Sequence, residues 1–220
     1  MASPKFNSLY NEARILELAA SLRHLRFSLH RGNFRNGPEV HMQFWNQVVA
    51  PRILQPAINL ESLEISRESC EAFDVSELTT YPRLAALSLS AIDLGESTIN
   101  QGDNTRCFPV EDFIARHRIT LRKLNLYNCR IRVDLKEPTS AEMPLRSWAD
   151  VYDRLAELLT ELVELVVVIK NDGYDLKYFS FRADDRGLFS EWAERDKLAL
   201  EHFKAVVENR KMDAGSSPQQ

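Results

Sequence analysis

Several features that would assign this chain to a functional class are scarce or missing. It has only seven glycines in 220 residues, and none of them forms a Gly-rich loop of the kind that cradles a phosphate after a strand. Its 32 acidic and 28 basic residues nearly cancel, so no excess of positive charge favours nucleic acid or an anionic membrane. The sequence therefore argues against a nucleotide-binding, nucleic-acid-binding or membrane-surface protein.

A long apolar segment and a disulfide pattern are also missing. The longest apolar run, 162–169, is interrupted by Glu164 and is far shorter than the roughly 20 residues that span a bilayer. The first residues lack the apolar core of a signal peptide. Cys70, Cys107 and Cys129 are an odd number without paired spacing. We therefore expect free thiols and a cytoplasmic or nuclear protein, with Cys129 buried as a structural residue.

Catalytic and metal-binding constellations do not stand out either. The five histidines fit no zinc motif, and there is no nucleophile elbow, Walker or kinase motif. His24 and His30 flank one expected strand and could form a local basic patch with Arg26 and Arg31, but solvated polar residues at a repeat edge are the better interpretation. The acid pairs 184–185 and 150/153 lie at expected helix starts, where the helix dipole stabilises a carboxylate. We expect no enzymatic activity, no cofactor and no metal.

What the chain does have is a repeated leucine pattern, clearest over 121–131. Leu121 and Leu124 are three residues apart, Leu124 and Leu126 are two apart, and Asn128-Cys129 follows. This is the L-x-x-L-x-L-x-x-N/C pattern of a leucine-rich repeat, in which a short strand lies beside similar neighbours. Four further copies begin at Leu22, Leu60, Leu84 and Leu162.

Helical segments fill the longer intervals between these copies. Apolar residues recur at helical spacing over 10–20, 39–50, 110–117 and 148–159, while 70–80 has room only for a short helical turn. Pro51 is expected to stop the second helix, and Ser147 with Asp150 to cap the start of the fourth. Two long polar loops, 95–106 and 132–146, interrupt the series, and we expect the first to be disordered.

The alternation of helix and strand predicts an α/β fold. We expect a leucine-rich-repeat-like solenoid over 1–170, made of about five helix–strand units with parallel strands, because each unit buries its apolar face only against the next. A doubly wound nucleotide-binding sheet is the main rival fold. It is disfavoured because these strands alternate apolar and polar residues, whereas strands of a sheet covered on both faces are apolar throughout.

The C-terminal part is expected to cap this array. Asn171-Asp172-Gly173 is typical of a hairpin turn, which predicts an antiparallel edge strand near 178–181. An amphipathic helix is expected over 188–207, so that 171–210 forms the cap and 211–220 a disordered tail. We attribute the apolar Val166 and Val168, which replace polar residues of earlier copies, to the need for this cap.

The outward residues of the first four strands are the candidate site. Parallel stacking is expected to align them as one shallow surface, with small residues in the middle and Arg26, Lys123 and Tyr127 at its flanks. Tyr and Arg are residue types that anchor interfaces. We predict that this surface binds a protein partner through His24, Arg26, Ser28, Glu64, Ser88, Lys123, Asn125 and Tyr127.

Three segments carry a family resemblance: Pro82-Arg-Leu84-Ala-Ala-Leu87-Ser-Leu89, 113–129 and 148–152. They resemble the leucine-rich half of fungal F-box-type proteins, where a helix ending in His precedes a Thr-Leu-x-x-Leu strand and a Trp-containing helix follows. The resemblance covers about 80–170. It implies a substrate-recognition module of a ubiquitin ligase, which binds a protein. Nothing here matches the Leu-Pro-x-Glu start of an F-box, so docking to the ligase adaptor is not expected from this chain alone.

Two alternatives remain open at this point. One is a small-molecule-binding or enzymatic α/β domain, with a pocket under the C-terminal hairpin near Val166, Val168, Tyr174 and Tyr178. The other is a degenerate repeat protein that has kept no partner.

Overall fold

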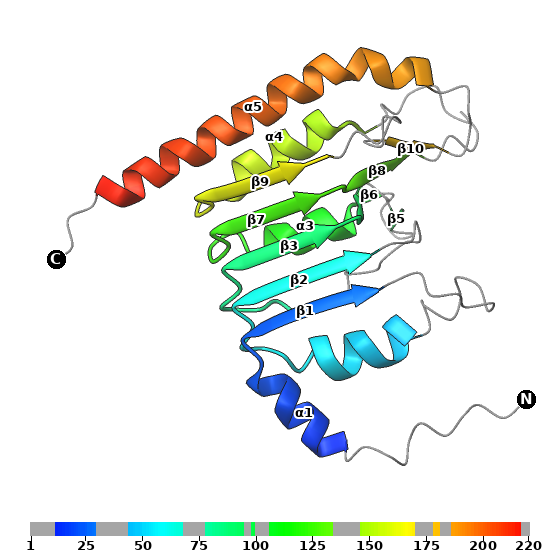
Figure 1. Cartoon of the computed structure of the whole chain (residues 1–220), viewed down its shortest axis with the longest axis vertical. Coiled ribbons are helices and arrows are strands. Elements are labelled where there is room, and N and C mark those ends of the chain that lie inside the picture. Colours follow the sequence, from blue (N-terminus) through cyan, green and yellow to red (C-terminus); the bar gives the residue numbers. More distant parts are fainter. Residues whose placement is uncertain are drawn as a thin grey trace, which may run out of the picture.

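The main sheet contains one strand from each leucine copy. The computed structural model describes residues 12–29, 44–67, 78–94, 98–99, 106–133, 146–169, 178–180 and 186–216. Within them the chain is α/β, as expected, with a five-stranded parallel sheet. Its strands follow one another in chain order (Figure 1): β1 (His24–Leu29), β2 (Ser62–Arg67), β3 (Ala86–Ser90), β7 (Lys123–Tyr127) and β9 (Glu164–Val168).

The helices run opposite to the strands, some of them behind the sheet and the first and last of them beyond its two end strands (Figure 1). They are α1 (Glu12–Ser21), η2 (Trp45–Leu54), α3 (Pro109–Arg116), α4 (Trp148–Leu158) and α5 (Arg186–Ser216). The expected helices over 10–20, 110–117 and 148–159 are confirmed within a residue or two. Ser147 and Asp150 form the predicted capping box at the start of α4. The interval 70–77 lies outside the described residues.

Each strand begins with the same backbone geometry. The N–H of the first leucine in four copies donates to the carbonyl three residues earlier, and Leu121 donates to His117, four residues earlier. In the first four copies, the residue directly after this leucine uses its carbonyl to accept hydrogen bonds from two successive N–H groups of the next unit. Glu61 O, for example, lies 2.9 Å from Ala85 N and 3.0 Å from Ala86 N. Arg23, Ala85 and Arg122 carbonyls do the same, which joins all five units in one register.

Two inward rows of side chains make the core beneath the sheet. One row places Leu25, Leu63, Leu87, Leu124 and Leu165 in register, and the other places Phe27, Ile65, Leu89, Leu126 and Val167. The members on the three central strands are buried, whereas those on β1 and β9 are half-buried. Full burial of such a side chain contributes roughly 1.5–3 kcal/mol. The rows therefore stabilise the sheet together with the helix side chains that complete the core, such as Phe113, Trp148 and Tyr152.

The chain bends at equivalent points after β3 and β7. Ala91 and Asn128, which follow these strands, have φ of 55° and 50°. Their N–H groups donate to the last residue of the neighbouring strand, Ala91 to Tyr127 O at 2.8 Å and Asn128 to Val168 O at 2.7 Å. The bend directs Ile92 and Cys129 into the core, so the N/C positions of the repeat pattern are structural, as expected for Cys129.

A second parallel sheet continues from these bends. It contains β4 (Asp93–Leu94), β8 (Arg130–Val133) and β10 (Tyr178–Ser180), in the order β10-β8-β4. The predicted antiparallel hairpin was therefore wrong, because β10 pairs parallel with β8 and not with β9. The Asn-Asp-Gly signal is local, whereas β8 offers a free edge for hydrogen bonds that a three-residue strand can use. Residues 170–177 lie outside the described part.

The helix before β2 corrects a second expectation. Pro51 lies inside η2 and does not end it, and Gln55 N donates to Ala50 O at 2.8 Å, five residues back. The wider π-helical turn accommodates a proline ring that would clash in an α-helix. Trp45 and Leu54 are buried on this helix, and the Trp45 ring meets Phe27 of β1 edge-on at 5.7 Å.

Helix α5 packs along α4 and runs in the same direction. It makes hydrogen bonds to both ends of α4. The buried Asp196 carboxylate accepts a hydrogen bond from Ala149 N at 2.9 Å, in the first turn of α4. At the other end, Arg210 donates to Ala156 O at 2.8 Å and Leu159 O at 2.7 Å. An acid at a helix N-terminus and a cation at its C-terminus both complement the macrodipole. Ala199, Phe203 and Val207 fill the interface between them.

The boundaries of the C-terminal helix and of the loops also differ from expectation. Helix α5 continues to Ser216, so 211–216 of the expected tail are helical. Inside the loop 95–106, β5 (Thr98–Ile99) pairs antiparallel with β6 (Arg106–Cys107), so part of a segment expected to be disordered is regular. Most of 132–146 lies outside the described residues. No described helix combines the length and apolar character needed to cross a membrane.

The first prediction concerns the hydrogen bonds of Arg210 to the C-terminal end of α4. Arg210→Ala removes two hydrogen bonds from helix-end carbonyls and should lower the free energy of unfolding by about 1–3 kcal/mol. Chemical denaturation of the full chain measures this. Lys204→Ala, at an exposed position of the same helix, is the matched control and should change stability by less than about 0.5 kcal/mol. Equal effects of the two substitutions would show that the hydrogen bonds of Arg210 to α4 do not stabilise the fold.

A second prediction concerns the left-handed bend after β3. A left-handed conformation costs a residue such as alanine roughly 1–2 kcal/mol, and asparagine tolerates it better. Ala91→Asn should therefore raise the free energy of unfolding by about 0.5–1 kcal/mol, measured by urea denaturation. Ser90→Asn, one residue earlier in the strand, should give no gain. A clear loss of stability in Ala91→Asn would show that the bend has another origin.

Candidate interaction surface

The open side of the main sheet brings the predicted site residues together. Three outward rows cross the five strands in register. They are His24/Ser62/Ala86/Lys123/Glu164, Arg26/Glu64/Ser88/Asn125/Val166 and Ser28/Ser66/Ser90/Tyr127/Val168. We call these fifteen positions the strand face. All eight predicted partner-binding residues lie on it, and no described helix covers it in Figure 1.

Regular alternation in the central strands explains why these side chains point outward. In β3 and β7 every second residue is buried, and the residues between them are half-buried. A strand with period two must present one set of side chains to each face of the sheet. The sequence pattern thus positions Ser88, Asn125 and Tyr127 on the strand face for the same reason that it buries Leu87, Leu124 and Leu126.

Charged side chains on the strand face are paired across neighbouring strands. Arg26 Nε lies 3.2 Å from Glu64 Oε1, and Lys123 Nζ lies 2.5 Å from Glu164 Oε1. Arg23 and Glu61, which immediately precede β1 and β2, form a third pair at 3.4 Å. Exposed pairs of this kind add little stability, at most about 1 kcal/mol each. Their main effect is electrostatic. The charge of each cation that was predicted to bind a partner is already balanced by a carboxylate on the neighbouring strand.

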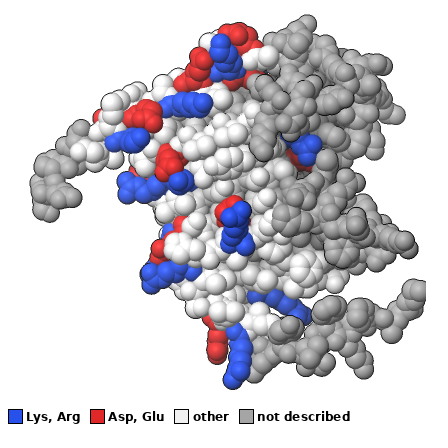
Figure 2. All heavy atoms as spheres, in the orientation of Figure 1, with Lys and Arg blue, Asp and Glu red and all other residues white. Residues whose placement is uncertain are grey.

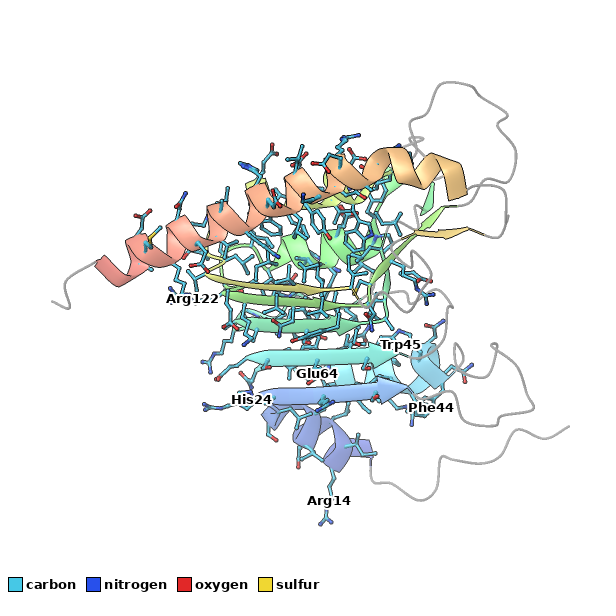
Figure 3. The ribbon with its side chains drawn as sticks, turned by 45° about the horizontal axis from the view of Figure 1, so that its top comes forward. Arg14, His24, Phe44, Trp45, Glu64 and Arg122 are labelled. Atoms are coloured by element: carbon cyan, nitrogen blue, oxygen red, sulfur yellow. The ribbon has the colours of Figure 1, made fainter. Side chains whose placement is uncertain are left out.

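The space-filling view agrees with this. Figure 2 looks onto the strand face and shows it mainly uncharged, with blue and red atoms side by side where charges occur. Small side chains, Ser62, Ser66, Ala86, Ser88 and Ser90, occupy its central strands. Glu64 and His24 come from β2 and β1 and are labelled on neighbouring ribbons in Figure 3. His30 and Arg31, which were considered with His24, lie outside the described residues.

Asn125 has an unusual position at the centre of β7. Its side-chain oxygen is buried but accepts no hydrogen bond from any described residue. Its register neighbours are Ser88 on β3 and Val166 on β9. A buried carbonyl oxygen without a donor is unfavourable, so most such groups in proteins are satisfied. Asn125 is therefore the one group of the strand face, among those described, with a clear unmet demand for a hydrogen-bond donor.

Val166 and Val168 also belong to the strand face. The sequence analysis did not include them among the site residues. They are register partners of Asn125 and Tyr127, and Val168 is 37% exposed. The C-terminal helix packs on α4 and also contacts β9, while Val168 stays partly exposed. Extending the aligned rows to the fifth strand would have placed them on the strand face, along with Glu164 as the partner of Lys123.

The residues named for the alternative pocket are only partly described. Val166 and Val168 face the open side of the sheet, Tyr178 lies on β10, which pairs with β8, and Tyr174 lies outside the described residues. Phe203 is buried on the helical side, 6.5 Å from the Tyr152 ring. The described residues also contain no group of three or more His, Cys, Asp or Glu side chains arranged to hold a metal ion.

One buried carboxylate, Glu111, was not anticipated from the sequence. Arg146 donates to it from two guanidinium nitrogens, one of them 2.9 Å from Oε1. A guanidinium nitrogen of Arg154 lies 3.1 Å from Oε2. Arg154 also reaches Asp112 at 2.6 Å, and the Arg146 guanidinium stacks 3.9 Å from the centre of the Phe108 ring. This cluster joins α3 to α4 and satisfies the buried charge. Its geometry is that of a structural ion-pair network.

His117 is a second buried polar residue, and it links consecutive units. Its Nε2 accepts a hydrogen bond from Tyr81 N at 2.9 Å, and Nδ1 donates to Phe113 O at 2.8 Å, so the ring is neutral. The Tyr81 ring stacks on it at 5.7 Å. Burial lowers the pKa of His117, and the nearby Arg116 charge adds to this. The histidine at the end of the helix in the family resemblance is thus a packing residue here.

Cys129 is equally structural. It is buried, and its thiol donates to Leu89 O at 3.4 Å. Burial raises the pKa of Cys129 to about 12, so the thiolate required for nucleophilic chemistry is not formed near neutral pH.

Comparison with known proteins gives no further guide to this surface. No protein-family model, curated protein or solved structure matches the chain. The interpretation of the strand face therefore depends on its own geometry and chemistry.

A third prediction follows from the buried His117. Its folded-state pKa is below the usual value of about 6.5, so below that pH the unfolded chain binds a proton that the folded chain does not. The stability that the neutral ring provides is complete above pH 6.5 and decreases as the pH falls, with a slope approaching 1.4 kcal/mol per pH unit. Urea denaturation between pH 5 and 8 measures this slope.

Two variants test the assignment to this side chain. His117→Gln removes the titrating group and should flatten the pH dependence while lowering stability at pH 8. His202→Gln, at an exposed position on α5, should leave the slope unchanged. If His117→Gln keeps the wild-type slope, the pH dependence belongs to other groups.

Proposed function

We propose that this chain is a non-enzymatic interaction module built as a leucine-rich-repeat solenoid, and that it binds a protein partner through the strand face. The observation that carries the proposal is an open sheet face on which fifteen side chains are aligned in register and internally charge-balanced. Parallel repeat arrays commonly use such a face for binding.

Support for the repeat architecture comes from the equivalence of the units. The strands lie in chain order, the same two-donor carbonyl recurs at four junctions, and the left-handed residue recurs after β3 and β7. The parallel packing of α5 on α4 is also the relation expected between helices of successive units. In this proposal α5 takes the place of the next helix and ends the array.

Support for binding, rather than catalysis, comes from how the buried polar groups are used. Glu111, Asp196 and His117 each hold one element against another. Each therefore has a structural role that leaves no need for a catalytic one. The family resemblance suggests the further step that the partner is a substrate of a ubiquitin ligase in the cytoplasm or nucleus.

A fourth prediction tests this function by affinity purification from the native cells. Arg26→Ala/Lys123→Ala/Tyr127→Ala changes three strand-face residues and should reduce recovery of the specific partner at least tenfold. The substituted side chains are not in the core, so the thermal unfolding midpoint should move by only a few degrees. A ligase adaptor among the recovered proteins would support the ubiquitin-ligase role.

The matched control changes three exposed residues on another surface. Glu194→Ala/Lys204→Ala/Glu201→Ala alters α5 only and should recover the partner as the wild type does. If the strand-face variant recovers every protein that the wild type recovers, the strand face is not the binding site.

A further inference from the structure

The turns that lead into β3 and β7 lie side by side at the end of the main sheet where the strands begin. Two hydrogen bonds join them. Tyr81 N donates to His117 Nε2 at 2.9 Å at the start of the turns, and Arg122 N donates to Ala85 O at 2.8 Å where the strands begin. Figure 3 shows Arg122 at this end of the sheet. The residues between these two bonds are therefore held next to each other.

The turn before β7 is one residue longer than the turns before the other four strands. In those four copies the first leucine donates its N–H to the carbonyl three residues back, whereas Leu121 N donates to His117 O, four residues back, at 2.8 Å. Because both ends of the turn are fixed, the additional residue has to bulge toward solvent. Ile119, inside this turn, is 73% exposed, more than any other large apolar side chain of the described residues.

Three exposed arginines accompany this isoleucine in the two turns. Arg83 precedes β3, and Arg118 and Arg122 precede β7. Among the residues that the structure describes, none offers the side chain of these arginines an ion pair or a hydrogen bond. Like charges repel, so three guanidinium groups in adjacent turns favour the approach of an anion. We call Arg83, Arg118, Ile119 and Arg122 the turn patch.

The chemistry of the turn patch specifies what complements it. A guanidinium group presents its donors in a planar fork that matches a carboxylate. A single exposed isoleucine is ordinary, and a single exposed ion pair contributes little. Three arginines around one apolar side chain require a partner that supplies several carboxylates and an aliphatic group together. An acidic segment of a protein has both within a few residues.

Acidic side chains on either side limit the size of the partner. On the β2 side, Glu61 pairs with Arg23. On the β9 side, Glu161 is exposed in the next turn, and Glu164 pairs with Lys123. A nucleic acid or an anionic bilayer extends beyond two turns and would meet these carboxylates, which is unfavourable. A short acidic segment does not reach them.

We propose that the turn patch binds a short acidic segment of a partner protein. The carboxylates of this segment pair with Arg83, Arg118 and Arg122, and an aliphatic side chain packs on Ile119. The turn patch lies outside the fifteen positions of the strand face. This inference therefore goes beyond the proposed function and holds or fails independently of it.

Peptide selection on the purified full chain tests the proposal. Random peptides displayed on phage are selected on the wild type, and the enriched sequences are synthesised and measured by fluorescence anisotropy. We expect peptides with several acidic residues around an aliphatic one. Their Kd should rise at least about tenfold between roughly 50 and 500 mM NaCl, because salt screens exposed charges. Arg83→Ser/Arg118→Ser/Arg122→Ser should weaken binding at least about tenfold at low salt.

A variant with the same loss of charge is the matched control. Arg14→Ser/Lys197→Ser/Lys204→Ser removes three exposed cations from α1 and α5. Charges farther away than a Debye length are screened, so this variant should keep the Kd within about twofold of the wild type. Ile119→Ser should weaken binding several-fold, whereas Leu198→Ser, at an exposed position of α5, should leave it unchanged. Circular dichroism verifies that each variant folds.

The contrary outcomes separate the turn patch from the strand face. Equal losses in the two triple variants would assign binding to net charge alone and overturn the inference. Acidic peptides that are lost in Arg26→Ala/Lys123→Ala/Tyr127→Ala but kept by the turn-patch variant would also overturn it and would support the strand face. A selection that yields no acidic peptides would overturn the turn patch and leave the proposed function intact.

Two polyanions complete the test. Vesicles of phosphatidylserine and phosphatidylcholine are examined by cosedimentation, and a single-stranded DNA oligonucleotide by anisotropy. Neither should bind the wild type, because the acids beside the turn patch oppose an extended anion. Binding of either one that is lost in the turn-patch variant would reassign the patch to a membrane or a nucleic acid and overturn the inference.

Discussion

A shared carbonyl at each junction between units sets the register on which the rest of the structure depends. Arg23, Glu61, Ala85 and Arg122 each accept hydrogen bonds from two successive N–H groups of the following strand. This interaction fixes where each strand begins relative to its neighbour. A slip of one residue would exchange the two faces of the strand and expose the leucines. The core rows and the strand face are therefore two consequences of the same backbone contact.

The same logic explains the two ends of the main sheet. Inner positions are buried on the central strands but only half-buried on β1 and β9, since an end strand has a neighbour on one side. Beyond β9, α5 covers α4 by contacts at both helix ends, with Asp196 near the N-terminus and Arg210 at the C-terminus. This cap is anchored to the helical layer. It also contacts β9, and Val168 on the outward side of that strand stays partly exposed.

Much of this architecture is visible in the sequence because it depends on local periodicity. The leucine spacing predicted all five strands and their order, and the Ser147 capping box and the buried Cys129 were also predicted correctly. The eight predicted site residues share one face because alternation and register together place them there. Whether that face binds a partner remains a prediction.

The parts that were missed depend on contacts between distant residues. The Asn-Asp-Gly turn signal does not reveal that β8 has a free edge for β10. Pro51 indicates a helix stop by its own properties, and only the π-helical turn around it allows the helix to continue. Cross-strand pairs such as Lys123 with Glu164, and the contacts of Asp196 and Arg210, join residues 41 to 54 positions apart only once the elements are packed together.

The central functional claim is that the strand face, and not the helical side, meets a partner. Site-specific photocrosslinking in the native cells tests it most directly, with a benzoylphenylalanine at Ser88, in the middle of the face, or at Lys204 on the exposed side of α5. The account predicts a crosslinked protein at Ser88 that does not appear at Lys204. The same crosslinked protein at both positions, or one at Lys204 alone, would contradict it.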